Sequence, residues 1–133
     1  MESNRTRPDS SKWIVAACAY VVIIFALSTL PGTSRRQHNE ISSHFMEILQ
    51  NALHIPLYAG FAWLLFHAVQ KAERRLSMTV TGIVILVAMA IALLDEWIQS
   101  HVPGRTASLL DVGLDLLGVL SVAIPMRLKL SSR

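Results

Sequence analysis

The chain has 133 residues, of which 53% are hydrophobic and 16% are charged, and its formal net charge is +3. This length allows one domain, and so much apolar content with so little charge excludes a disordered chain and is unusual for a small soluble domain. The single cysteine, Cys18, excludes a disulfide scaffold, and no basic patch is interleaved with aromatic residues, so we predict a membrane protein with no nucleic-acid partner.

Four apolar stretches of 18 residues follow one another along the chain. At about 1.5 Å per residue, each stretch covers roughly 27 Å as a helix, close to the hydrocarbon core of about 30 Å. Of the 12 basic and 9 acidic residues, only Asp111 and Asp115 lie inside these stretches. Because backbone amides find no water at that depth, we predict an all-α membrane protein with four transmembrane helices, at Trp13–Leu30, Ala52–Val69, Ser77–Leu94 and Leu109–Met126.

The first apolar stretch has a second interpretation, as a cleaved signal peptide. Basic residues precede it, and Ala26-Leu27-Ser28 resembles a cleavage site. Its apolar region is longer than the usual core of a signal peptide, which favours a retained transmembrane helix.

The segment before the second stretch has apolar residues at helical spacing. Ile41, Phe45, Ile48 and Leu49 recur with the period of an α-helix within residues 41–50. This pattern predicts a short interfacial helix that leads into the second transmembrane helix. A helix that lies on the headgroups is favoured over one that acts as a lid for the polar residues described below.

The distribution of Lys and Arg predicts the orientation of the chain. Nine of the 12 basic residues lie in the tails, 1–12 and 127–133, and in the connection 70–76, whereas three lie in the other two connections. Basic segments stay in the cytoplasm. We therefore predict a multi-pass protein of the cell membrane, with a transmembrane domain at 13–126 between two cytoplasmic tails.

This orientation brings polar residues from several segments to the outer face. They are His54, Tyr58, Asp95, Glu96, Gln99, Arg105, Asp111 and Asp115. Residues four apart share a helical face, so Asp111 and Asp115 repel in a low dielectric unless they share a proton, pair with a cation or hold a metal. Arg105 is the best available cation, because it is permanently charged and binds carboxylates or phosphates through two parallel hydrogen bonds.

Several of these polar residues also have a purely structural interpretation. Ser108 and Asp111 fit a capping box, in which Asp111 only satisfies amides at the start of the fourth helix. His54 is equally well read as a hydrogen-bonded packing residue. Asp115 lies about two turns inside the helix, beyond any cap, where a carboxylate is costly and usually functional. The alternative for Asp115 is a neutral acid bonded to a neighbouring helix.

Small residues predict where helices approach one another closely. Gly113 and Gly118 lie in the fourth helix, and Gly82, Ala88 and Ala92 lie along the third. Close packing there would bring the acids of these two helices together.

Several catalytic signatures are absent from the sequence. It contains no His-Glu-x-x-His motif, no nucleophile elbow and no phosphate-binding glycine loop. The acids and His54 are suitable ligands for a hard cation, but no tight metal-ligand spacing occurs. We therefore predict no metal site and no other cofactor.

Three groups of residues form a further pattern. The most specific group comprises Glu96-x-x-Gln99, Pro103-Gly104-Arg105, Ser108-Leu109-Leu110-Asp111 and Gly118. The two weaker groups are Leu27-Ser28-Thr29-Leu30-Pro31-Gly32 and His54-x-x-x-Tyr58. Together these residues resemble the VanZ-like family of small bacterial membrane proteins, over about residues 13–126. Where that family usually has Asn, this chain has Asp115, which leaves the charge at this position open.

The resemblance implies a bacterial inner-membrane protein with a shared polar site. The family is named for a member associated with resistance to the glycopeptide antibiotic teicoplanin. We hypothesise that the outer polar residues bind or modify the headgroup of a lipid or a cell-wall precursor. Glu96 and Asp111 are the candidate catalytic bases. The candidate binding residues are His54, Tyr58, Gln99, Arg105 and Asp115.

Two other functions stay open. The first is a non-enzymatic helper or transport subunit that relays protons or anchors a partner helix. A chain of this length leaves little room for a conduit, so that function requires an oligomer or a partner. The second is a purely structural role for the polar cluster in packing.

Overall fold

A computed structural model describes residues 10–31, 40–72, 77–105 and 107–131. This part of the chain contains four α-helices and no strand, which confirms the all-α prediction. The helices are α1 (Ser11–Ser28), α2 (Glu40–Ala72), α3 (Met78–Gln99) and α4 (Leu109–Ser131). Each contains a window long and apolar enough to cross a membrane, as predicted.

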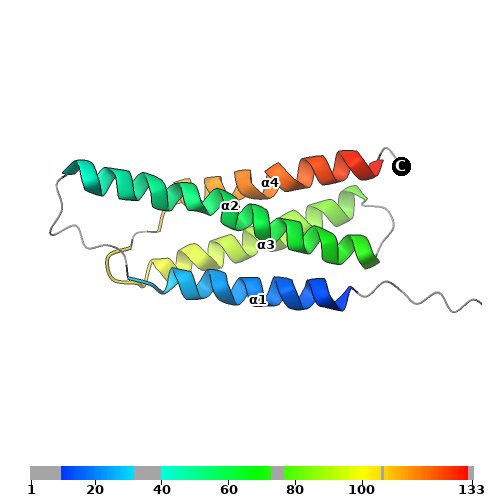
Figure 1. Ribbon diagram of the computed structural model, residues 1–133, viewed down its shortest axis with the longest axis horizontal. Coiled ribbons are helices and arrows are strands. Elements are labelled where there is room, and N and C mark those ends of the chain that lie inside the picture. Colours follow the sequence, from blue (N-terminus) through cyan, green and yellow to red (C-terminus); the bar gives the residue numbers. More distant parts are fainter. Residues whose placement is uncertain (1–9, 32–39, 73–76, 106, 132–133) are drawn as a thin grey trace, which may run out of the picture.

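Helix α2 is much longer than its apolar stretch. Its 33 residues extend over about 50 Å, against roughly 30 Å for the hydrocarbon core. The segment 41–50 belongs to α2 and runs into the membrane span without a break, so a short interfacial helix distinct from the span stays a prediction. Figure 1 shows this first part of α2 extending past the ends of the other helices. Its position relative to the membrane interface stays a prediction.

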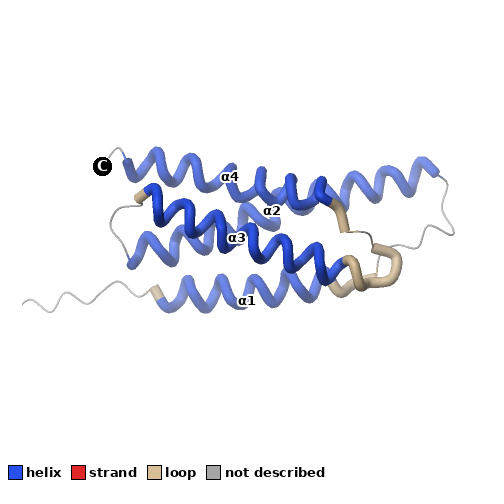
Figure 2. The backbone as a smooth tube through the Cα atoms, turned by 180° about the vertical axis from the view of Figure 1, so that it is seen from behind, coloured by secondary structure: helices blue, strands red, loops and turns tan. Residues whose placement is uncertain are grey.

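The four helices form a bundle in which each runs opposite to the one before it (Figure 1). Helix α2 has its most extensive contact with α4 and also packs against α1 and α3, whereas no contact joins α1 to α4 within the described residues. Seen from the other side in Figure 2, α3 lies in front, between α4 and α1. Helices α2 and α3 therefore separate the two outer helices.

The interior of the bundle is small and the outside is apolar. The core is centred on Ile24, Tyr58, Phe61, Ala92 and Val119, all at most 2% exposed. Only 17% to 33% of the residues in each span are buried inside the bundle, and leucine, isoleucine and valine side chains on all four helices face outward. Such a surface is suited to lipid and not to water.

Close approach of two helices occurs at one of the predicted glycines. A Cβ atom added to Gly118 would lie 2.4 Å from the backbone oxygen of Ile55, so α4 touches the backbone of α2 there. Ala88 and Ala92 are fully buried, as expected of contact points on α3. The prediction was wrong for Gly82 and Gly113, because within the described residues no heavy atom outside the helix's own nearby backbone lies within 4 Å of a Cβ added to either.

Aromatic side chains lie at both ends of the bundle. At the end where α1 begins, the rings of Trp13, Trp63 and His67 pack together, and His67 Nδ1 donates to the Trp63 carbonyl. At the other end, the rings of Trp97 and His101 lie edge to face. Tryptophan favours the two interfaces of a bilayer, so these rings agree with a bundle that spans the membrane.

Candidate functional site

Buried polar residues collect at one end of the bundle, where α1 and α3 finish and α4 begins; we call it the polar end. Of the buried polar side chains in the described part of the chain, only Thr81 lies elsewhere, bonded to the Ser77 carbonyl near the start of α3. The others are Ser28, Asp95, Glu96, Gln99, Asp111 and Asp115, each at most 6% exposed. Three different helices therefore bring hydroxyl, carboxyl or amide groups to one place.

The most deeply buried acid pairs with a histidine. Asp115 is 0% exposed in α4, and its Oδ1 lies 2.8 Å from Nδ1 of His54 in α2. This contact links the two helices one turn away from the Gly118 contact. Asp115 Oδ2 is also buried and has no hydrogen-bond partner. The pair places His54 at the site, with its Nδ1 hydrogen-bonded to the carboxylate of Asp115.

A second group of contacts joins α3 to the end of α1. The carboxyl of Asp95 is bonded through Oδ1 to the Ser28 hydroxyl and through Oδ2 to Gln99 Nε2, the latter at 3.1 Å. Gln99 Oε1 accepts a hydrogen bond from Arg105 Nη1 at 3.0 Å. Both oxygens of Asp95 are thus satisfied. The sequence predicts Asp95 at the outer face but indicates no role for it, although Asp95 and Gln99 are four residues apart.

Arg105 contributes to the site differently from the expectation. Its Nε and Nη2 donate to the backbone oxygens of Leu30 and Leu27, at 3.1 and 3.3 Å, so the guanidinium caps the end of α1. These bonds and the bond to Gln99 hold the connection between α3 and α4 against α1. The pairing of Arg105 with the acids of α4 is therefore corrected, because His54 is the partner of Asp115.

Glu96 occupies the place that a capping box would give to Asp111. Its Oε2 accepts the backbone N–H of Ser108 at 2.7 Å, just before α4 begins, and the Ser108 hydroxyl accepts the N–H of Leu110. The start of α4 is thus capped by a side chain from α3. The other oxygen, Oε1, is buried without a hydrogen-bond partner, which leaves it available to a ligand.

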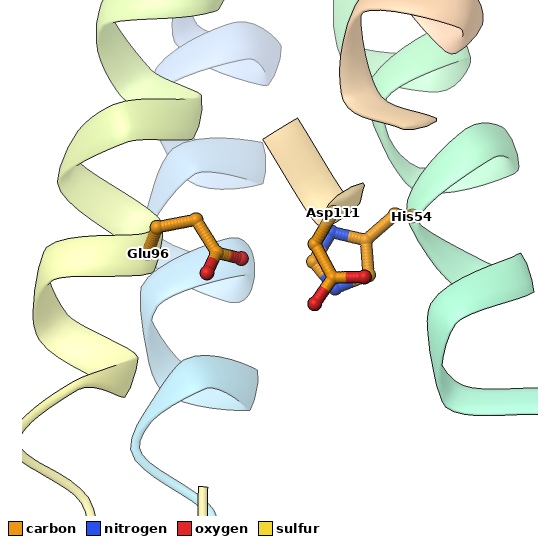
Figure 3. A group of neighbouring side chains, drawn as sticks. All are labelled: His54, Glu96 and Asp111. Atoms are coloured by element: carbon orange, nitrogen blue, oxygen red, sulfur yellow. The ribbon is translucent and has the colours of Figure 1, made fainter. Parts of the chain in front are cut away.

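Glu96, Asp111 and His54 point toward one another from α3, α4 and α2, as Figure 3 shows. Each offers one nitrogen or oxygen atom, and these three atoms all lie within 4.8 Å of one another. The side chains are nearly buried, with Glu96 at 5%, Asp111 at 6% and the His54 side chain at 11% exposure. The arrangement combines an imidazole with two carboxylates, a donor set that binds divalent cations.

Tyr58 lies one turn deeper than His54 on α2. Its ring is 0% exposed and packs edge-on against Phe61, with ring centroids 6.4 Å apart. Its hydroxyl lies near Asp95. The structure therefore brings Tyr58 to the inner boundary of the polar end, where it separates the polar residues from the apolar core.

Comparison with known proteins supplies a family. A family model described as VanZ/LLP1 matches residues 12–129, which is nearly the whole chain. No curated protein and no solved structure matches the chain.

Proposed function

This chain belongs to the VanZ/LLP1 family, and we propose that its polar end binds or modifies the headgroup of a lipid or a cell-wall precursor. The membrane itself is then its first partner, because four apolar helices contact the bilayer. The VanZ name links the family to glycopeptide resistance, and this kind of resistance concerns the chemistry of the cell envelope. In this proposal, the acids at the polar end meet a ligand that arrives at the membrane surface.

One observation carries the proposal: buried carboxyl oxygens that the bundle itself leaves unsatisfied. Glu96 Oε1 and Asp115 Oδ2 are both buried without a hydrogen-bond partner. A buried polar atom without a partner costs about 1–3 kcal/mol, and more when it is charged. Ionisable groups within membrane spans are costly and usually belong to functional sites. A packing role alone would be served by a fully satisfied pair such as that of Asp95 and Gln99.

Support for an outward-facing polar end comes from the basic residues. Nine of the 12 lie in the tails and the connection 70–76, and the described parts of these segments belong to the opposite end of the bundle. The site would then face the outer leaflet of a bacterial inner membrane, where wall precursors and lipid headgroups are exposed. This orientation is part of the proposal.

We assign roles to the residues as follows. Glu96 acts as the general base, since it is buried and has an oxygen with no partner. Asp111 lies opposite it, in the first turn of α4, and is the second candidate for that role. Arg105 holds an anionic headgroup with the second proton of each Nη group, while its bonds to α1 and Gln99 fix the guanidinium.

The remaining predicted residues shape and hold this site. His54 and Asp115 orient one another across α2 and α4. Gln99 fixes the Arg105 side chain, and Tyr58 closes the inner boundary. Under this proposal these four residues bind or position the headgroup and take no part in proton transfer to it.

The test is a profile of envelope lipids and wall precursors in a strain that lacks the protein. The strain is complemented with the wild type, with Glu96→Gln or with His101→Asn at matched membrane expression. His101 is an exposed residue of the same end that lies outside the acid cluster, which makes it a matched control. We expect one species to accumulate, and the wild type and His101→Asn to clear it while Glu96→Gln does not.

Two results would contradict the proposal. If Glu96→Gln clears the species as well as the wild type, Glu96 performs no chemistry at the site. If nothing accumulates in the deletion strain, the non-enzymatic helper becomes the better proposal. Crosslinking in native membranes then decides whether the chain has the partner or second copy that a helper requires.

A further inference from the structure

We propose that His54, Glu96 and Asp111 form a binding site for one divalent transition-metal cation at the polar end. Mn²⁺ and Zn²⁺ are the cations that this donor set fits. The inference deepens the proposed function and rests on it for the purpose of the metal, which would hold an anionic headgroup oxygen. The existence of the site rests on its own geometry.

The first line of support is convergence from three helices. The donor atoms of the three residues lie within 4.8 Å of one another, although the residues are far apart in the chain. Ligands about 2.1 Å from a tetrahedral ion lie about 3.4 Å apart. The limit of 4.8 Å exceeds that spacing by about 1.4 Å, and Figure 3 shows the three side chains directed toward one another.

The second line of support is the oxygen that nothing in the bundle satisfies. Glu96 is only 5% exposed, its Oε2 accepts the Ser108 amide, and its Oε1 has no partner. Figure 3 shows the Glu96 carboxyl directed toward Asp111 and His54. Two carboxyls that approach each other in a buried site require a proton or a cation between them. A metal ion would satisfy Oε1 and the approach of Asp111 at once. With the metal bound, Glu96 and Asp111 would act as its ligands in place of the general-base role assigned to them above.

The third line of support is the orientation of the histidine. Nδ1 of His54 is bonded to Asp115 Oδ1 at 2.8 Å, so with Nδ1–H as the donor the lone pair lies on Nε2. Metal-binding histidines usually donate their other ring N–H to a carboxylate in this way, which fixes the ring and raises its basicity. Asp115 is therefore a positioning residue that acts through His54.

The donor set selects the kind of metal. Ca²⁺ and Mg²⁺ prefer oxygen ligands throughout, whereas imidazole favours Zn²⁺ and other transition metals. Three protein ligands leave coordination positions open, as in catalytic sites. The proposal departs from the sequence prediction of no metal, which relied on the lack of short ligand spacing. Residues 54, 96 and 111 show no such spacing because each comes from a different helix.

The test measures metal binding directly, without lipid or activity. The protein is purified in detergent without a polyhistidine tag, stripped with a chelator and titrated with Mn²⁺, whose free fraction is followed by electron paramagnetic resonance. Zn²⁺ is titrated in parallel by its effect on thermal unfolding. We expect one Mn²⁺ per wild-type chain, and affinity at least about 10-fold weaker in His54→Ala, Glu96→Gln and Asp111→Asn.

Two further variants test whether a change in metal affinity comes from this site, and not from an exposed histidine elsewhere or from loss of the folded state. His101→Ala removes an exposed histidine of the same end and should leave the affinity unchanged. Asp115→Asn keeps all three ligands and a polar partner for His54, and should weaken binding about 10-fold while the protein stays folded. It therefore tests the site even if a ligand substitution prevents folding.

Several outcomes would overturn the inference. They are a folded wild type that binds neither ion at millimolar concentration, binding that survives all three ligand substitutions, and binding that is lost in His101→Ala. Failure of the proposed function looks different. A protein that binds Mn²⁺ through these residues, in a strain where no envelope species accumulates, keeps the metal site and loses the headgroup proposal.

Discussion

Substituting Gly118 by alanine is expected to force α4 away from α2. The new Cβ would lie 2.4 Å from the backbone oxygen of Ile55 and 3.1 Å from the backbone nitrogen of Ala59. Ordinary van der Waals contacts of a Cβ begin at about 3.4 Å, so the two helices must separate by about 1 Å. Both contacts are with backbone atoms inside a helix, which cannot rotate aside as a side chain can.

The expected change in the free energy of unfolding combines two costs, overpacking and lost dispersion energy, with one gain in helix propensity. Overpacking of a well-packed interior costs about 1–3 kcal/mol, and the upper part of that range applies here because the neighbour is backbone. A separation of 0.5–1 Å also forfeits about a quarter to half of the dispersion energy of each contact it opens. The higher helix propensity of alanine returns up to about 1 kcal/mol. We therefore expect Gly118→Ala to lower the free energy of unfolding by about 1–2 kcal/mol.

Gly113 provides a matched control on the same helix. It is exposed, and a Cβ added there meets no heavy atom within 4 Å, so Gly113→Ala should raise the free energy of unfolding by up to about 1 kcal/mol. Equilibrium unfolding of both variants in mixed micelles, titrated with a denaturing detergent, measures the difference, which we expect to be about 2–3 kcal/mol. If Gly118→Ala is as stable as Gly113→Ala, then α2 and α4 do not touch as described.

Gly60→Ala should cost less than about 1 kcal/mol, because the added Cβ meets the hydroxyl end of the Tyr20 side chain at 2.6 Å and that end can move. In a Tyr20→Phe background the cost should disappear; equal costs in both backgrounds, measured by the same unfolding titration, would show that the hydroxyl is not the obstacle. For orientation, Ser100→Cys at the polar end and Met78→Cys at the opposite end are compared in a Cys18→Ala background with a membrane-impermeant maleimide. Intact cells should label only the first variant, and labelling of only the second would reverse the orientation.

The spans could be predicted from the sequence because the bilayer imposes a simple rule on length and polarity. The end of α3 shows where that rule stops. Hydropathy ended the predicted stretch at Leu94, yet the helix continues to Gln99. The added residues include Asp95 and Glu96, which are buried because the bundle supplies hydrogen-bond partners for them. Hydropathy treats such residues as exposed, since it takes no account of partners on other helices.

Contacts within one helix were more predictable than contacts between helices. The four-residue spacing of Asp95 and Gln99 placed them on one face, and they are bonded at 3.1 Å. The partner of His54 depends on how α2 and α4 are rotated about their axes, which no spacing within either helix determines. The same holds for Arg105, whose charge suggested a carboxylate but whose bonds to α1 reach two backbone carbonyls.

The two adjacent acids of α3 show how the bundle divides its polar end. Consecutive residues of a helix point about 100° apart, so Asp95 and Glu96 serve different sides. Asp95 turns to Ser28 at the end of α1 and has both oxygens bonded. Glu96 turns to the start of α4 and has one oxygen bonded and one without a partner. The side toward α1 is therefore held together by satisfied hydrogen bonds, whereas the side between α2 and α4 keeps unsatisfied oxygens. A ligand gains more free energy by binding where the protein's own polar groups lack partners, so under the proposed function we expect the ligand to bind on the side of Glu96.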